Sequence, residues 1–332
     1  MNNFDSHFAG KTALVTGGAG FIGSHLCEAL IQAGCHVVSV DDYSAGKEHN
    51  LVSLTGSDSL TVIKADICDV KAMEEIFTMG LDYVFHNAAS KKNICLRDPM
   101  RDLMVNAGGT LLLLQLAVKY RIKKFLHAST GSVYGEPQFF PTEEEHSLNP
   151  VSYYGVSKLA GEKYVQAFHH LYELNTTVLR YFHVYGPRQE SNQYGGVVSI
   201  FLRKILAKQD LTIFGDGSQM RSFTWVKDIV RANMLCAVSD RSVGEVYNCA
   251  SGIQITIKEL AEGMLQMTGA DKSLRIVYQD WLPGDIVYFN VSNKKIADHV
   301  GIDFEKDFWG NMSRTLDDFV SYLQQCVLTS EA

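Results

Sequence analysis

Tyr154 and Lys158 carry two reactive groups at a spacing that a helix brings together. Residues i and i+4 lie one turn apart on one helix face, so the phenol and the ammonium point the same way. The pKa of a free tyrosine is about 10, and a neighbouring cation stabilises the phenolate and brings this pKa toward neutrality. Such a tyrosine can act as a base toward a substrate hydroxyl, which Thr130 can hold in place. The same spacing also occurs by chance on many helix surfaces, so it needs support from the rest of the chain.

A glycine-rich turn near the start of the chain indicates a binding site for a phosphorylated ligand. Gly17, Gly20 and Gly23 are spaced G-x-x-G-x-x-G between a predicted strand, Thr12–Thr16, and a predicted helix, 24–33. Such a turn lets the backbone approach a pyrophosphate closely. It also aims the N–H groups of a helix start at the negative charge.

The next apolar run ends in an acidic pair. The predicted strand 35–40 is followed by Asp41 and Asp42, and a carboxylate at this place accepts from the hydroxyls of an adenosine ribose. A phosphorylated ribose is repelled there. Strand, glycines, helix, strand and acid in this order therefore predict a bound dinucleotide and favour NAD over NADP.

Composition sets limits on the function. The 332 residues are 46% hydrophobic with 6 prolines, enough for one or two sizeable cores. A net charge of −7 without a basic block argues against a nucleic-acid partner. No apolar run reaches the length of a membrane span, so we expect no membrane contact. The 7 cysteines are scattered and lack metal-ligand spacing, which predicts a reduced, cytoplasmic protein without a metal site.

Strands and helices are predicted to alternate through the first half of the chain. Such alternation predicts an α/β fold with a Rossmann-type, doubly wound parallel sheet and helices on both faces. Ligands bind at the carboxyl ends of the strands in these sheets. The further strands are expected at 60–64, 83–86, 124–129 and 176–182, and the helices at 70–78, 103–119 and 152–174.

After residue 180 the predicted elements become shorter. We expect an NAD-binding domain over 1–180 and a smaller, mixed α/β substrate-binding lobe over 181–332. No linker rich in Pro, Gly or Ser separates them, so the boundary is soft and later segments can rejoin the first domain. Helices are expected at 197–207, 228–238, 257–268 and 311–327, and strands at 211–214, 245–248 and 275–279.

Together these motifs resemble the extended short-chain dehydrogenases/reductases, within the NAD-dependent nucleotide-sugar epimerase/dehydratase family. The resemblance runs from about Lys11 to Ile302 and includes His86-Asn-Ala-Ala89 and Arg180-Tyr-Phe-His183. It implies that the glycine turn binds NAD together with Phe21, Ile22, Asp41, Asp42, Ser44, Asp66, Ile67, Ala88, Ala89, Lys91, Asn106, Ser129, Tyr154, Lys158 and Tyr181.

The same resemblance implies separate roles for several of these residues. Asp66 and Ile67 would hold the adenine, and Lys91 would lie on the cofactor phosphates. Lys158 would also bridge the nicotinamide ribose, and Asn106 would brace the active-site helix through its backbone.

Two positions distinguish the activities within this family. Family members that act as 4,6-dehydratases carry Asp and Glu where this chain has Gly131 and Ser132, and decarboxylases keep the glutamate. Without a carboxylate, elimination and decarboxylation lose their proton shuttle. The chain resembles the 4-epimerases here, which implies that Tyr154 takes the C4 hydroxyl proton while NAD takes the hydride. The 4-keto sugar then turns over before the hydride returns.

The resemblance also implies a nucleotide-sugar substrate, a UDP-hexose or UDP-hexuronate. Arg221, with Arg188, would meet the diphosphate, and Phe214 would lie beside the base. His183 replaces a usual asparagine, and the bulk of Phe289 argues against an N-acetyl group. The same residues would also be found if Arg221 were an exposed surface arginine, His183 a core residue and Phe214 part of an apolar edge strand. The full expected set is Lys92, Thr130, Ser132, Tyr154, His183, Arg188, Val197, Phe214, Arg221 and Phe289.

Two other functions fit the same residues. A nucleotide-sugar 4-ketoreductase uses the same Tyr, Lys and Thr but exchanges its cofactor in each turnover. A non-catalytic NAD-binding protein shares the fold. Family members resembling this chain dimerise by packing the helices at 103–119 and 152–174 into a four-helix bundle. We therefore expect a homodimer, although a buried core helix would show the same apolar content.

Overall fold

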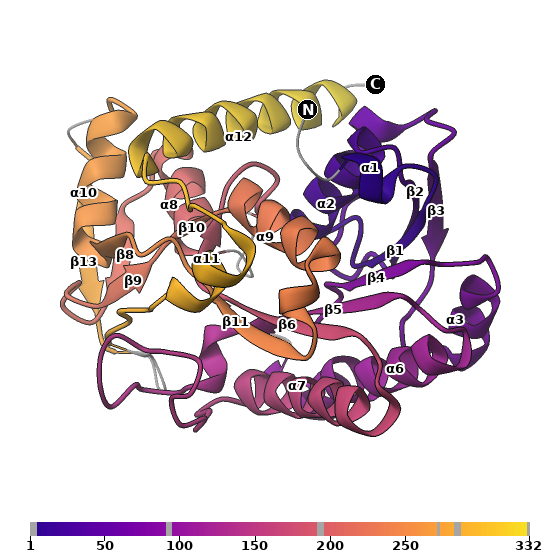
Figure 1. Cartoon of the computed structure of the whole chain (residues 1–332). Helices are drawn as coiled ribbons and strands as arrows, with labels where there is room; N and C mark the ends of the chain where they lie inside the picture. Colours follow the sequence, from indigo (N-terminus) through magenta and orange to yellow (C-terminus); the bar gives the residue numbers. More distant parts are fainter. Residues whose placement is uncertain (1–4, 91–94, 191–195, 271–272, 282–286, 331–332) are drawn as a thin grey trace.

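A seven-stranded sheet forms the centre of the protein. The computed structural model describes residues 5–90, 95–190, 196–270, 273–281 and 287–330, with side chains as far as Ser321 in the last helix. The strands of the sheet are β1 (Thr12–Thr16), β2 (His36–Asp41), β3 (Leu60–Lys64), β4 (Tyr83–His86), β5 (Lys124–Thr130), β6 (Thr176–Tyr181) and β11 (Glu245–Cys249). They lie in the order β3-β2-β1-β4-β5-β6-β11, and every neighbouring pair is parallel. The predicted doubly wound α/β fold is confirmed (Figure 1).

Helices cover both faces of this sheet (Figure 1). Alternate residues of β1 enter different cores, because successive strand side chains point to opposite faces. Ala13 and Val15 pack with Leu26 of one helix layer, whereas Leu14 packs with Leu113 of the other. The first layer is α2 (Phe21–Gln32) with α9 (Val226–Val238), and the second is α3 (Val70–Phe77), α6 (Thr110–Lys119) and α7 (Tyr153–Tyr172).

A second lobe packs around its own apolar core, which includes Phe201, Leu260 and Met312. Its pairs of short strands are β8 (Leu211–Phe214) with β13 (Ile276–Gln279), β9 (Met220–Ser222) with β12 (Gln254–Thr256), and β7 (Val184–Tyr185) with β10 (Thr224–Trp225). Its helices are α8 (Val197–Leu206), α10 (Ile257–Met267) and α12 (Phe308–Ser330). The remaining helices are α1 (Asp5–Phe8), α5 (Pro99–Leu103), α11 (Lys294–Val300) and the 3₁₀ turns η1 (Glu48–Leu54), η3 (Gly131–Val133) and η4 (Asp240–Ser242).

The predicted helix at 103–119 is wrong in its first part. The chain forms α5, then a π-helical segment, η2 (Met104–Gly109), and only then α6. Packing explains the wide turn: a Cβ on Gly109 would lie 2.7 Å from Ile67, and one on Gly161 of α7 would lie 2.5 Å from the Asn106 carbonyl oxygen. The turn therefore lies in close contact with two neighbouring elements, as π turns at functional sites often do.

Other differences are smaller. α2 begins at Phe21 and not at 24, because Gly20 is its N-cap and the glycine turn runs directly into the helix. β11 pairs with β6, so a strand from the later half does rejoin the first sheet. The sequence analysis missed β7, β9, β10, β12 and α11, which are too short to show a clear period.

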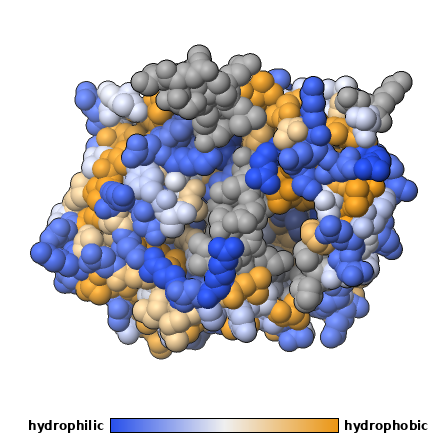
Figure 2. Space-filling model, turned by 180° about the vertical axis from the view of Figure 1, so that it is seen from behind, coloured by the Kyte–Doolittle hydropathy of each residue, from blue (hydrophilic) through white to orange (hydrophobic). Residues whose placement is uncertain are grey.

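The described part of the chain contains no helix long and apolar enough to cross a membrane. The face seen in Figure 2 mixes hydrophilic with hydrophobic residues. Among the described residues, six cysteines are free and no group of acidic, His and Cys side chains could hold a metal ion.

Candidate active site

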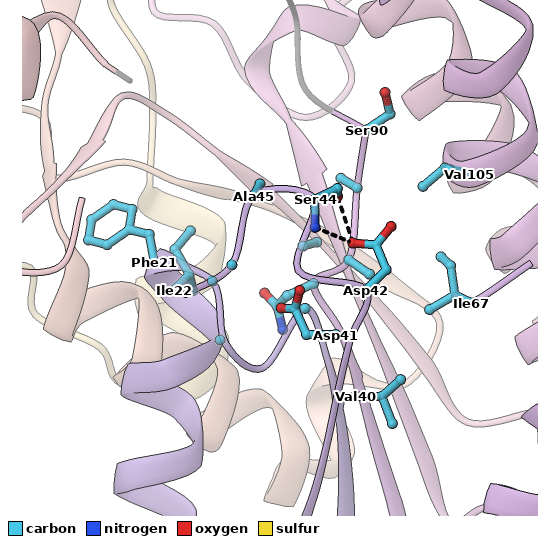
Figure 3. Close-up of a pocket in the computed structure, with 18 of the residues that line it drawn as sticks. Phe21, Ile22, Val40, Asp41, Asp42, Ser44, Ala45, Ile67, Ser90 and Val105 are labelled. Carbon is cyan, nitrogen blue, oxygen red and sulfur yellow. Dashed lines mark hydrogen bonds between the residues drawn. The ribbon is translucent and has the colours of Figure 1, made fainter. Parts of the chain in front are cut away.

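A cavity of about 600 Å³ opens at the carboxyl ends of the parallel strands. Figure 3 shows Phe21 and Ile22 at the start of α2 on one side, and Ile67 and Val105 on the other. Asp41 and Asp42 lie between them at the end of β2. The residues predicted for the cofactor that line it are Gly17, Gly20, Phe21, Ile22, Gly23, Asp41, Asp42, Ser44, Asp66, Ile67, Ala88, Ala89, Ser129, Tyr154, Lys158 and Tyr181.

The glycine turn packs closely on itself and on the chain after β4, so no side chain fits at Gly17 or Gly23. A Cβ on Gly17, whose φ is +68°, would lie 2.9 Å from the Ala88 nitrogen, and one on Gly23 would lie 2.0 Å from the Gly17 oxygen. Gly20 caps α2 without a side chain, so it leaves the first-turn N–H groups to an anion. This cradle fits the pyrophosphate of NAD.

The two acids at the end of β2 are held by nearby donors. Asp41 accepts from the Ala19 nitrogen at 3.0 Å and from the Tyr43 nitrogen at 2.8 Å. Burial raises its pKa. Asp42 accepts from the Ser44 nitrogen at 2.9 Å and hydroxyl at 2.6 Å (Figure 3). Two carboxylates at this position fit an unphosphorylated ribose and disfavour NADP.

The three predicted catalytic residues come together at the cavity. Tyr154 and Lys158 line it from α7, and Thr130 at the end of β5 is hydrogen-bonded to Tyr154. Ser152 caps α7 by accepting from the Gly155 nitrogen at 3.1 Å. The helix start also packs tightly on the strand end, since a Cβ on Gly155 would lie 2.8 Å from the Ser132 oxygen.

The electrostatics of Tyr154 in the chain by itself oppose its ionisation. Burial raises the pKa of Tyr154 to about 12, and repulsion from the Asp102 carboxylate is the second contribution in the same direction. The interaction with the Thr130 side chain lowers this pKa but is the smaller effect. Burial also lowers the pKa of Lys158 to about 8. The predicted shift of the Tyr154 pKa toward neutrality also requires the positively charged nicotinamide of NAD beyond Lys158, so it stays a prediction for the enzyme with NAD bound. A positively charged ligand in the cavity would act in the opposite direction.

A buried polar network behind the cavity contains Asp102. Ser157 donates to Asp102 at 2.5 Å, and Asn106 donates to Asp102 at 3.0 Å and to the Ser157 hydroxyl at 2.9 Å. The Asn106 amide oxygen accepts from the Ser90 nitrogen at 2.9 Å. Asn106 thus contacts the active-site helix through the side chain of Ser157, and does not itself line the cavity.

A second network contains an ion pair that the sequence analysis missed. Glu162 continues the i+4 series of Tyr154 and Lys158, and this spacing was the available signal. The Arg180 guanidinium lies 2.5 Å from the Glu162 carboxylate, and both side chains are buried. Ser129 donates to the same carboxylate at 2.8 Å.

The residues predicted for the substrate fall into three groups: Thr130 and Ser132 beside Tyr154, His183 with Phe289, and three residues of the second lobe. Thr130 donates to Ser132 at 3.2 Å beside Tyr154. His183 (φ +34°) lies with its ring centre 5.8 Å from that of buried Phe289. Arg221, Phe214 and Val197 belong to β9, β8 and α8 of the second lobe, and Arg221 donates to the Met220 oxygen at 3.0 Å.

Arg188 is placed differently from the expectation. Its guanidinium lies 3.2 Å from Glu28 on α2, and its backbone nitrogen donates to Asp318 on α12 at 2.8 Å. Arg188 does not line the cavity and joins the lobes. Lys91 and Lys92 lie outside the described residues.

The close packing of the glycine turn gives a testable prediction. Gly23→Ala places a methyl group against the Gly17 carbonyl, so we expect the free energy of unfolding to fall by about 1–3 kcal/mol and NAD binding to weaken. Gly108→Ala is the control, because its Cβ meets only Met104 at 3.5 Å. Chemical denaturation and calorimetric titration with NAD measure both. Equal values for the two variants would contradict the cradle.

Comparisons with known proteins agree with this geometry. Residues 13–250 match the NAD dependent epimerase/dehydratase family. The chain is 38% identical to a UDP-glucose 4-epimerase of Mycolicibacterium smegmatis over 77% of this chain and 82% of that one.

Two solved structures are also similar. A UDP-glucose 4-epimerase from Thermotoga maritima, solved with UDP-glucose, is 38% identical with a TM-score of 0.88, over 94% of this chain and 99% of that one. A UDP-glucuronic acid 4-epimerase from Bacillus cereus, solved with UDP-glucuronic acid and NAD, is 29% identical with a TM-score of 0.86, over the same shares. The chain belongs to the NAD dependent epimerase/dehydratase family, and its cofactor is NAD.

Proposed function

We propose that this enzyme is a nucleotide-sugar 4-epimerase that oxidises and re-reduces the sugar at C4, with a UDP-hexose or UDP-hexuronate as substrate. The observation that carries the proposal is that Tyr154 and Lys158 line the cavity together from one helix turn of α7, close to Thr130 at the end of β5. No carboxylate accompanies them at positions 131 and 132. This set supports hydroxyl deprotonation and offers no acid for elimination.

Packing around Gly131 supports the same choice. A Cβ on Gly131 would lie 2.4 Å from the Phe182 ring. Phe182 is fixed from the other side by Tyr134, with ring centres 6.2 Å apart, and by Phe289, at 5.5 Å. A dehydratase-type acid at this position therefore needs the whole aromatic group to move.

The chain's own residues define the proton path. Thr130 orients the sugar hydroxyl toward Tyr154, which accepts its proton and later returns it. Lys158 lies one turn further along α7 and lines the cavity beside Tyr154. Bound NAD supplies the hydride acceptor and donor that such an epimerisation needs.

The relatives and the second lobe support the proposed substrate class. Two of the relatives are named for UDP-glucose and one for UDP-glucuronic acid. We place NAD on residues 1–180 and the nucleotide sugar against 181–332, with Arg221 toward the diphosphate and Phe214 toward the base. Buried Phe289 packs against Phe182 and His183, and we propose that its bulk limits the space for an N-acetyl group.

Proton NMR tests the activity directly. The purified protein is given UDP-glucose, UDP-glucuronate or UDP-N-acetylglucosamine in separate tubes without added cofactor. A galacto-configured anomeric signal in the glucose or glucuronate tube is expected. Turnover only of a 4-keto sugar with added NADH would instead identify a 4-ketoreductase, and NAD binding without turnover a non-catalytic protein.

Tyr154→Phe removes the proposed base and keeps the ring. We expect turnover to fall by at least about a hundredfold with the fold unchanged, because only the hydroxyl is lost. Lys158→Met should reduce both turnover and NAD affinity. Initial rates by the NMR assay and NAD titration measure these effects, and a Tyr154→Phe variant with more than a few per cent of the rate would refute the assignment.

The charge of Asp102 should set the pH dependence. Its carboxylate disfavours the Tyr154 phenolate and so raises the pKa of Tyr154. Asp102→Asn removes this repulsion, lowers that pKa, and should move the acidic limb of the rate profile to lower pH. Ser157→Ala is the control, because it removes a hydrogen bond to Asp102 and leaves the charge. A limb that stays in place in Asp102→Asn would refute the electrostatic role.

We also propose that the enzyme is a homodimer formed through α6 and α7, which lie side by side in Figure 1. One face of α7 carries apolar side chains every three or four residues, a spacing that forms a helix-packing stripe. Each is at least partly exposed in the single chain. The stripe consists of Tyr153, Val156, Ala160, Tyr164, Ala167 and Leu171.

A charge in this stripe should separate the subunits. Tyr164, which is 41% exposed, is replaced by Glu, and light scattering after size exclusion measures the mass. We expect a dimer for the parent chain and a monomer for the variant. Val52→Glu, at an apolar position of η1 that is 58% exposed, should stay dimeric. A parent chain that is already monomeric would refute the proposal.

A further inference from the structure

Arg101 is the one arginine that lines the described cavity, and neither the glycine turn nor the catalytic set accounts for it. It lies on the short helix α5, which Asp98 caps by accepting from the Arg101 nitrogen at 2.9 Å. The side chain is 35% exposed, so the guanidinium lies at the rim of the cavity and not in a core.

The guanidinium joins two strand ends. It lies 2.7 Å from the Asp66 carboxylate after β3 and 3.5 Å from the Asp42 carboxylate after β2. Both acids are fixed from behind, since Asp66 accepts from the Cys68 nitrogen at 2.9 Å and Asp42 accepts from Ser44. A planar guanidinium between two fixed carboxylates is itself held in one place.

This contact crosses the end of the cavity where the adenine is expected. Asp66 and Ile67 are the residues predicted for the adenine, and Val105 lines the same end. Figure 3 shows Asp42 directed toward the side where Ile67 and Val105 lie. Ile67 and Val105 give this end an apolar lining, and the charged bridge lies beside them, a combination that suits an adenine ring.

The surrounding charges exclude another role for this arginine. An arginine near an adenosine ribose can bind the 2′-phosphate of NADP. Here two carboxylates face one guanidinium, and Asp41 adds a third close by. The local charge is negative, so this end of the cavity repels a phosphate and Arg101 is left to act on the carboxylates and the ring.

We infer that Arg101, bridged to Asp42 and Asp66, closes the adenine end of the cavity and retains NAD between turnovers. An enzyme that regenerates its cofactor within each cycle gains from such retention, whereas one that exchanges the cofactor does not. The inference rests on NAD as the cofactor and does not depend on which sugar is epimerised.

Exchange of bound NAD tests this without any sugar. The protein is loaded with radiolabelled NAD and diluted into excess unlabelled NAD, and the loss of label is followed. Arg101→Ala should release NAD about tenfold faster than the parent chain, as expected for a lost charge-assisted contact. Arg101→Lys keeps the charge without the planar fork and should fall between the two.

A matched control separates this effect from a general loss of surface charge. Arg275 pairs with Asp210 at 2.9 Å on the second lobe, outside the cavity lining, and Arg275→Ala should release NAD at the parental rate. Nicotinamide mononucleotide, which lacks the adenosine, should bind Arg101→Ala as tightly as it binds the parent chain, whereas ADP-ribose should bind more weakly. Circular dichroism confirms that each variant is folded.

Two results would overturn the inference. Parental release rates in both Arg101 variants would show that the bridge does not retain NAD. Equal weakening of nicotinamide mononucleotide and ADP-ribose would show that Arg101 supports the whole cavity and not its adenine end. Because no sugar is present, neither result bears on the epimerase proposal.

Discussion

The buried ion pair between Glu162 and Arg180 fixes the geometry on which the site depends. Glu162 lies one turn beyond Lys158 on α7, and Arg180 lies near the end of β6, so the pair joins the active-site helix to the sheet. Arg180 also donates to Tyr134 at 2.6 Å, and Tyr134 donates to Asn248 of β11 at 2.7 Å. Breaking one side of such a pair leaves an uncompensated buried charge and costs about 3–5 kcal/mol. The ion pair and these hydrogen bonds therefore hold α7, β6 and β11 together.

This rigid frame places reactive groups where burial opposes their charged forms. Burial raises the pKa of Tyr154 to about 12 and lowers that of Lys158 to about 8. The chain alone thus favours a neutral phenol and weakens the ammonium that would activate it. A cationic group in the cavity would lower the pKa of Tyr154, so the proposed role of Tyr154 as a base depends on bound NAD.

Local features of the sequence predicted much of this protein. The glycine turn, Asp41 and the Tyr154–Lys158 pair depend on residues adjacent in the chain or one helix turn apart, so local spacing, taken with the order of strands and helices, indicated that they line one cavity. Features that depend on distant partners were missed or misplaced. Arg188 belongs to a motif that suggested a substrate contact, but Glu28, 160 residues earlier, accepts from its guanidinium. The π turn at Met104–Gly109 depends on contacts with Ile67 and Gly161, and no local pattern shows them.

The main argument against a dehydratase is the missing carboxylate side chain at Gly131. Gly131 lacks the carboxylate of a dehydratase, and the Phe182 ring lies 2.4 Å from where its Cβ would be. Since Phe182 packs against Tyr134 and Phe289, the space cannot be regained by moving one side chain. Tyr134 is in turn bonded to Arg180 of the buried ion pair. Introducing an acid at Gly131 would therefore disturb the side chains that pack between the end of β5 and Arg180.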